Sequence, residues 1–420
     1  MRVLQINTFY LFGSTGRIVR DLKVLAEQKG IESFAAYGPE IDNGDHGTLR
    51  LQSIPRRKMN ILRTRLFGHH GFYNEKETER LIRWMDELKP DVIHLHNIHN
   101  HYVHVGRLFE YIKEHSIPVV WTLHDCWPFT GHCAYFDYAN CDKWMTMCHE
   151  CPSIHEYPPT WFFDRTSRNY IDKKNVFCGV KHLTLVTPSK WLSGQTRESF
   201  LNDYPVKVIN NGVDTHVFSL QGENVKNRLG VVGKKVLLAM ATTFDRRKGI
   251  QYLKMLPEML NDDEVLILIG LAKEQLRQFQ MPKCIGLGRT KDVEELSAIY
   301  SAADVLINPT LEDNFPTTNI EALACGTPVV TFETGGSVES VLDGESLFCD
   351  NGITYSSVGA VVPKGDLLAM LGAARCIMAK GKTAYRESCR KKAEERYDKN
   401  KQYQKYIDLY NELYTKSINS

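Results

Sequence analysis

Two acidic residues in the second half of the chain, Asp313 and Glu321, have a spacing that suits binding of a polyhydroxylated anion. A buried strand is expected over 305–308, and a helical pattern then runs to Gly326, a typical helix-ending residue. Asp313 therefore lies on the loop after the strand, and Glu321 lies inside the next helix. The backbone N–H groups of Phe315–Asn319 fall at the helix start. Such amides bind phosphate oxygens, while carboxylates accept hydrogen bonds from sugar hydroxyls.

A basic loop follows another expected strand, Val236–Met240. The loop contains Arg246, Arg247 and Lys248. A guanidinium group can grip two phosphate oxygens at once, so this loop suits a diphosphate. An ordinary solvated basic loop is the alternative.

The first half of the chain has its own candidates at strand ends. Gly13, Gly16 and Arg17 follow the expected first strand, where glycines let backbone amides approach phosphate closely. Their spacing differs from the three-glycine dinucleotide fingerprint, which disfavours a nicotinamide cofactor. His124 ends the expected strand Val119–His124 and is a candidate for contacting a ligand.

A histidine-rich segment, Asp91–His104, precedes it. His94 and His96 share one face of a strand and could bind a metal, or they could be structural residues that line the strand end. Spacing alone leaves both interpretations open.

Cysteines crowd into residues 126–151. Cys148-x-x-Cys151 is a half-site for tetrahedral zinc, and Cys133 and Cys141 could complete four thiolates. Such a closed shell would be structural. Free or buried thiols are the alternative.

Composition excludes some classes of partner. A net charge of +2 argues against nucleic acid as the main partner, and the start of the chain reads as a strand, so a cytoplasmic location is expected. The basic segment Pro55–Phe72, in which arginines alternate with apolar residues, suits contact with anionic lipid at the inner face of a membrane. A helix with solvated arginines is the alternative.

Short apolar runs separated by helical patterns predict an α/β protein with two parallel sheets. The predicted domains are residues 1–186, with a cysteine-rich insertion at 126–152, residues 187–395, and a C-terminal helix at 396–420. The predicted strands are Val3–Ile6, Ser33–Tyr37, Asp91–His96, Val119–His124, Thr184–Val186, Val206–Ile209, Val236–Met240, Val265–Gly270, Val305–Asn308 and Pro328–Thr331.

The run Leu311–Val330, LEDNFPTTNIEALACGTPVV, resembles the donor-binding signature of glycosyltransferase family 4, in which seven residues separate two acids. The resemblance covers most of the chain and is closest to capsule, exopolysaccharide and lipopolysaccharide enzymes related to colanic-acid biosynthesis. Two positions depart from the family pattern. Asp313 stands where the family usually has Glu, and Thr243 stands where it has an Arg five positions before Lys248.

The resemblance implies the GT-B fold: two Rossmann-like domains facing each other across a cleft, with the C-terminal helix crossing back to the N-terminal domain. It also implies roles for residues. His124 and Asp313 would contact the donor sugar, while Lys248 and Arg247 would stabilise the departing diphosphate. The donor-binding set would comprise Gly16, Arg17, Asn314, Phe315, Thr317, Thr318 and Glu321.

The expected function is therefore a retaining hexosyltransferase of bacterial surface polysaccharide biosynthesis. It would use a nucleotide-diphosphate-sugar donor and a glycan acceptor, and the resemblance implies that this acceptor is lipid-linked. Catalysis would need no metal. Two alternatives remain: a nucleotide-sugar epimerase or phosphorylase of the same fold, and a degenerate transferase that serves as an assembly partner.

Overall fold

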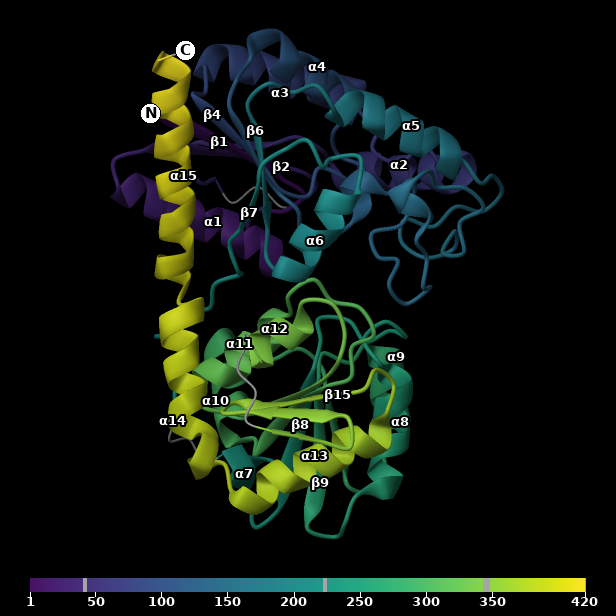
Figure 1. Cartoon of the computed structure of the whole chain (residues 1–420), viewed down its shortest axis with the longest axis vertical. Helices are drawn as coiled ribbons and strands as arrows, with labels where there is room; N and C mark the ends of the chain where they lie inside the picture. The colour runs from purple at the N-terminus through teal and green to yellow at the C-terminus, as the bar shows by residue number, and fades with distance from the viewer. Residues whose placement is uncertain (41–43, 222–224, 343–347, 420) are drawn as a thin grey trace. The chain divides into compact units, whose positions relative to one another are not determined.

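The computed structural model describes residues 1–40, 44–221, 225–342 and 348–419. The chain divides into two compact units (Figure 1). Unit 1 comprises Met1–Ile209 together with Tyr403–Ser420, and unit 2 comprises Asn210–Gln402. Each unit is an α/β domain built on one sheet, as predicted.

Unit 1 contains a seven-stranded parallel sheet with the order β3-β2-β1-β4-β5-β6-β7. Its strands are β1 (Arg2–Asn7), β2 (Glu32–Tyr37), β3 (Thr48–Arg50), β4 (Val92–Leu95), β5 (Val119–Thr122), β6 (Leu183–Thr187) and β7 (Val206–Val208). Its helices are α1 (Gly13–Gln28), α2 (Ile54–Phe67), α3 (Glu75–Leu88), α4 (Val105–His115), α5 (Thr166–Phe177) and α6 (Lys190–Glu198).

Both faces of this sheet are covered, which explains why its central strands β4 and β5 are buried along their whole length. On β5, Val120 packs with α1 and with the C-terminal helix α15 (Lys399–Asn419), whereas Val119 and Trp121 pack with α4 and α5 on the other face. The tyrosine stripe of α15 supplies Tyr403, Tyr406 and Tyr410 to the first of these clusters. The end of the chain is thus part of the unit 1 core.

The division between the units lies later in the chain than 186/187. The strand expected at Val206–Ile209 pairs with β6 as β7, so the residues up to Ile209 group with unit 1. At the other end, unit 2 extends to Gln402.

Unit 2 contains an eight-stranded sheet with the order β10-β9-β8-β11-β12-β15-β14-β13, in which β13 and β14 are antiparallel to their neighbours. Its strands are β8 (Lys235–Met240), β9 (Glu264–Ile269), β10 (Cys284–Leu287), β11 (Val305–Asn308), β12 (Val329–Phe332), β13 (Phe348–Asp350), β14 (Ile353–Ser356) and β15 (Gly359–Val362). Its helices are α7 (Val225–Arg228), α8 (Ile250–Met259), α9 (Lys273–Leu276), α10 (Val293–Ala302), α11 (Thr317–Ala324), α12 (Ser337–Val341), α13 (Leu367–Lys380) and α14 (Thr383–Lys392).

In this sheet β8 and β11 are parallel neighbours, so the loops that follow them emerge at the same edge. Those loops contain the basic and acidic residues singled out above. Polar side chains at the carboxyl ends of adjacent parallel strands are where open α/β sheets bind ligands.

Candidate functional site

The loop after β8 is fixed against the loop after β11 by a close backbone approach. Gly249 has a positive φ of 72°, and a Cβ atom there would lie 2.1 Å from the carbonyl oxygen of Pro309. The N–H of Leu311 donates to the carbonyl of Arg247 over 2.8 Å. A larger residue than glycine would separate the two loops, so Gly249 positions Lys248 beside the acidic loop.

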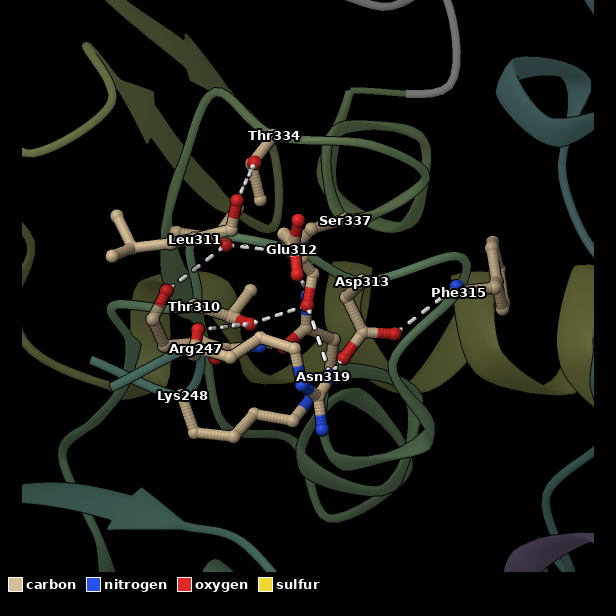
Figure 2. Close-up of polar contacts among 12 residues, drawn as sticks. Arg247, Lys248, Thr310, Leu311, Glu312, Asp313, Phe315, Asn319, Thr334 and Ser337 are labelled. Carbon is tan, nitrogen blue, oxygen red and sulfur yellow. Dashed lines mark hydrogen bonds and ion pairs between the residues drawn. The ribbon is translucent and has the colours of Figure 1, made fainter. Parts of the chain in front are cut away.

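Lys248 and Asp313 form an ion pair at this edge (Figure 2). The other carboxylate oxygen of Asp313, Oδ1, accepts the N–H of Phe315 over 3.2 Å. The two side chains are 22% and 14% exposed, so solvent still reaches both. Burial lowers the pKa of Lys248, and the charge of Asp313 opposes that shift. The pair is a partly desolvated charge centre that an anion can reach.

The two candidate arginines differ in position. Arg247 is half-buried and its Nη1 donates to the carbonyl of Glu312 over 3.3 Å, so it reaches the same loop as Lys248 (Figure 2). Arg246 and Thr243 are exposed. Arg247 is the better placed of the two to supply a second cation beside Asp313.

Helix α11 carries the remaining predicted residues of unit 2. Thr317 and Thr318 are half-buried in its first turn, after the buried Asn314 and Phe315. Glu321, one turn later, is only 5% exposed, and its Oε2 accepts a hydrogen bond from the Tyr300 hydroxyl over 3.0 Å. A carboxylate held in this way can accept hydrogen bonds from hydroxyl groups.

Some residues that shape this region were not predicted. Tyr300 comes from α10, and its apolar context in the sequence gave no sign of a polar role. Asn319 is fully buried and donates to Ser337 Oγ over 3.1 Å and to Ser340 Oγ over 2.8 Å, which joins α11 to α12. Gly335 has a positive φ, and a Cβ there would lie 2.1 Å from the Asp313 carbonyl oxygen. The Gly335-Gly336 dipeptide was the one available sequence signal.

In unit 1, His124 follows β5 and its Nε2 lies 3.1 Å from Nδ1 of His96. Burial lowers the pKa of His124 to about 4, so its imidazole is neutral at pH 7. His94, on the same strand face as His96, contacts the Tyr410 hydroxyl at 2.5 Å and Thr122 Oγ1 at 2.8 Å. These contacts match the structural interpretation of the histidine pair.

Gly16 and Arg17 lie in the first turn of α1. A Cβ at Gly16 would come within 3.2 Å of the Leu11 backbone, so the residue packs tightly against the preceding turn. In that turn the N–H groups of Tyr10 and Leu11 donate to the carboxylate of Glu40, at 2.6 Å and 3.1 Å. The amides of this turn therefore already bind an anionic group.

Two protein-family models match the chain: "Glycosyltransferase Family 4" over residues 50–217 and "Glycosyl transferases group 1" over residues 234–379. The chain belongs to glycosyltransferase family 4. The chain is 28% identical to the colanic acid biosynthesis glycosyl transferase WcaC of Escherichia coli strain K12. The alignment comprises 346 residues, which cover 79% of this chain and 82% of WcaC.

Solved structures confirm the GT-B fold of this family 4 enzyme. Sucrose-phosphate synthase of Thermosynechococcus elongatus superposes with a TM-score of 0.72 at 16% identity, covering 99% of both chains. Anabaena Alr3699/HepE in complex with UDP superposes with a TM-score of 0.65 at 16% identity, and the match covers 98% of this chain and 100% of that one. Within the described residues, no helix has the length and apolar character needed to cross a membrane.

Proposed function

We propose that this glycosyltransferase moves a hexose, with retention of configuration, from a nucleotide-diphosphate sugar to a lipid-linked glycan in surface polysaccharide biosynthesis. The observation that carries the proposal is the Lys248–Asp313 ion pair beside the start of α11. It places a cation for phosphate and a carboxylate for sugar hydroxyls beside the backbone amides of a helix start, at one sheet edge. The relative named for colanic acid biosynthesis supports the polysaccharide assignment.

Binding of the donor would give Lys248 and Asp313 new partners. The diphosphate would take the Lys248 ammonium from Asp313, with Arg247 adding a second cation. The released Asp313 carboxylate would then accept hydrogen bonds from the sugar. Glu321, held by Tyr300, would accept from the ribose hydroxyls. Charge on the leaving diphosphate would thus be stabilised by protein groups that are in place before the reaction, and without a divalent metal.

A thermal-shift panel tests the donor assignment, because a ligand that binds the native state raises Tm. UDP is the first probe, since a structural neighbour holds it; GDP and ADP follow. UDP should raise Tm of the wild type and of Lys254→Met, an exposed lysine on α8, but not that of Lys248→Met. Equal shifts in all three proteins would contradict the assignment.

The reaction itself is tested with the donor found by that panel and an isolated lipid-linked acceptor. Proton NMR of the product should show the anomeric configuration of the donor sugar, and added magnesium or manganese should leave the rate unchanged. Nucleoside diphosphate should be released only when the acceptor is present. An epimerised nucleotide sugar formed without acceptor would replace the transferase proposal by the epimerase alternative.

We also infer that unit 1 contacts an anionic membrane, where a lipid-linked acceptor would reside. Exposed aromatic residues of the loop after Thr160 adjoin the basic helix α2: the N–H of Trp161 donates to the Arg65 carbonyl over 2.8 Å, and the Arg65 guanidinium lies 5.4 Å from the Trp161 ring. Phe162 and Phe163 are 70% and 62% exposed. Aromatic side chains beside arginines suit the interface of an anionic bilayer.

Vesicle co-sedimentation tests this contact. The protein should bind vesicles that contain phosphatidylglycerol and dissociate from them at high salt. It should not bind vesicles of pure phosphatidylcholine. The double variant Phe162→Ser, Phe163→Ser should lose binding, whereas Leu368→Ser, which removes an equally exposed apolar side chain from unit 2, should keep it. Unchanged binding by the double variant would exclude this surface.

A further inference from the structure

Four cysteines of unit 1 line one small cavity in the segment after β5. They are Cys133, Cys141, Cys148 and Cys151, and the cavity has a volume of about 10 Å³. That is close to the space of one water-sized sphere. All four thiols are free. The fold thus gathers thiols that are spread over the sequence around a space for a single small occupant.

Backbone amides are already directed at two of these sulfurs. The N–H of Gly131 donates to Cys148 Sγ over 3.2 Å. A side chain at Gly131 would prevent this approach, because a Cβ there would lie 2.3 Å from the Thr166 carbonyl oxygen. Cys151 also has a backbone hydrogen bond at Ser153 and a side-chain hydrogen bond with Cys133, so two of the four sulfurs are already in contact. Amides that point at sulfur stabilise the thiolate, which is the form that binds metals.

A buried lysine supplies the opposite charge next to the cavity. Lys173 is 1% exposed, and its ammonium donates to the carbonyls of Trp127 and Thr130, at 2.7 Å and 3.0 Å. A buried cation is stable only beside compensating negative charge. Thiolates around the cavity would provide it.

Two further contacts shape the ligand loop. Lys143 lines the cavity, and its Nζ donates to the carbonyls of His149 and Glu150, each at 3.1 Å, inside the Cys148-x-x-Cys151 turn. His132 also lines the cavity, and its buried Nε2 has no hydrogen-bond partner. An unpaired buried nitrogen indicates that this cavity is built for a polar occupant.

We propose that Cys133, Cys141, Cys148 and Cys151 bind one zinc ion as four thiolates. This donor set fits zinc in tetrahedral geometry. Among the described residues, no group of three or more His, Cys, Asp or Glu side chains is arranged to hold a metal ion, so zinc binding would require the four thiols to turn toward the cavity. The thiols would release their protons, leaving a site of net charge −2 that Lys173 and Lys143 offset.

Zinc at this position would be structural, because four ligands leave no open position for substrate. It would fix the loop that begins directly after His124. That loop is tied back at its start by the Trp127 N–H, which donates to Asp125 Oδ1 over 3.0 Å, and by the Cys126 N–H, which donates to the Ala134 carbonyl over 2.9 Å. The inference is independent of the proposed donor and acceptor.

Metal content of the purified full-length protein tests the site. Inductively coupled plasma mass spectrometry should give about one zinc per chain. Cys148→Ser and Cys133→Ser should each lose it, whereas Cys349→Ser, an exposed thiol of unit 2, should keep it. Zinc-free wild type, iron in place of zinc, or a Cys133–Cys151 disulfide found by mass spectrometry would overturn the proposal.

Two measurements on the wild type keep the test decisive if a variant fails to fold. A chelator should lower Tm, and added zinc, but not magnesium, should restore it. Replacement by cobalt should give the visible absorption of tetrahedral thiolate coordination. An unchanged Tm with chelator would count against the site. Full zinc content in Cys141→Ser would overturn the four-thiol shell and point to His132 as the fourth ligand.

Discussion

Both units place polar side chains at the carboxyl ends of parallel strands, but the two edges differ in charge. In unit 2 the loops after β8 and β11 hold the ion pair of Lys248 and Asp313. In unit 1, His94 lies in β4, His96 follows that strand, and His124 follows β5. Burial lowers the pKa of each of these histidines. The unit 2 edge therefore carries an ion pair, whereas these three histidines of unit 1 are neutral at pH 7. Charge at the unit 1 edge lies on Asp125, which follows His124: burial raises its pKa, but His99, with Nε2 2.7 Å from Oδ2, lowers the pKa below its usual value overall.

The difference follows from what surrounds each group. Lys248 and Asp313 compensate each other's charge and keep some contact with solvent, so both charges are tolerated despite partial burial. His94 and His96 are 0% and 1% exposed and bond to neutral groups, so a proton there would be a buried, unpaired charge. We therefore expect an anionic phosphate to bind at the unit 2 edge, and the neutral histidines of unit 1 to contact neutral hydroxyl groups.

Removing the cation of the ionic edge should have the largest effect. Lys248→Met keeps the length of the side chain but deletes the charge that would stabilise the leaving diphosphate. Loss of one such group typically lowers the rate by about 10²- to 10³-fold. We expect that decrease in kcat/KM, with Lys254→Met unchanged. If kcat/KM fell by less than about threefold while Tm showed the variant to be folded, Lys248 would have no role in the reaction.

The ionic edge was largely predictable from the sequence because its parts are local. Lys248 follows a strand that reads as a continuous apolar run, and Asp313 and Glu321 flank a helix start. The Tyr300–Glu321 bond was not predictable, because it depends on how α10 packs against α11.

Unit 1 was harder to predict, for physical reasons. The strand β7 is short and half-exposed, so its sequence does not reveal that it pairs with β6, and the unit boundary was placed too early. The family resemblance did place the C-terminal helix against the N-terminal domain, and Tyr406 and Tyr410 of α15 are in the unit 1 core. The hydrogen-bond partners of His94 come from β5 and from α15, which no local pattern connects.

Glu321→Gln should weaken donor binding by less than the loss of Lys248. The amide keeps the size of the side chain and can still accept from Tyr300, but it loses the charge. Hydrogen bonds to charged groups contribute about 1.5–3 kcal/mol, so we expect an increase of roughly 30-fold in the donor KM and in the Kd of the nucleoside diphosphate. Glu294→Gln, exposed on α10, is the control. A donor KM that stays constant would disprove a role in ribose binding.

Acid should destabilise unit 1, around His94 and His96, before it destabilises unit 2. The pKa values of His94 and His96 lie well below 6.5 in the folded protein, so below pH 6.5 the unfolded state binds more protons and stability falls. Each histidine should lower the free energy of unfolding by about 1 kcal/mol between pH 6.5 and 5.5. Hydrogen exchange should show β4 and β5 losing protection in this window more than β8 and β9, and His94→Gln should reduce that loss. Equal loss in both units would abolish the contrast.

Tyr300→Phe should have the smallest effect, because Tyr300 acts through Glu321 without touching the donor. Losing its hydroxyl removes one buried hydrogen bond and lets the carboxylate turn, at a cost of about 1 kcal/mol, or roughly a fivefold higher donor KM. Since the diphosphate-binding cation is untouched, kcat should stay constant, a split that general destabilisation would not produce. Tyr252→Phe, whose ring packs on Phe332, is the matched control. If Tyr300→Phe changed kcat and left KM alone, Glu321 would belong to the chemical step and the ionic edge would extend along α11.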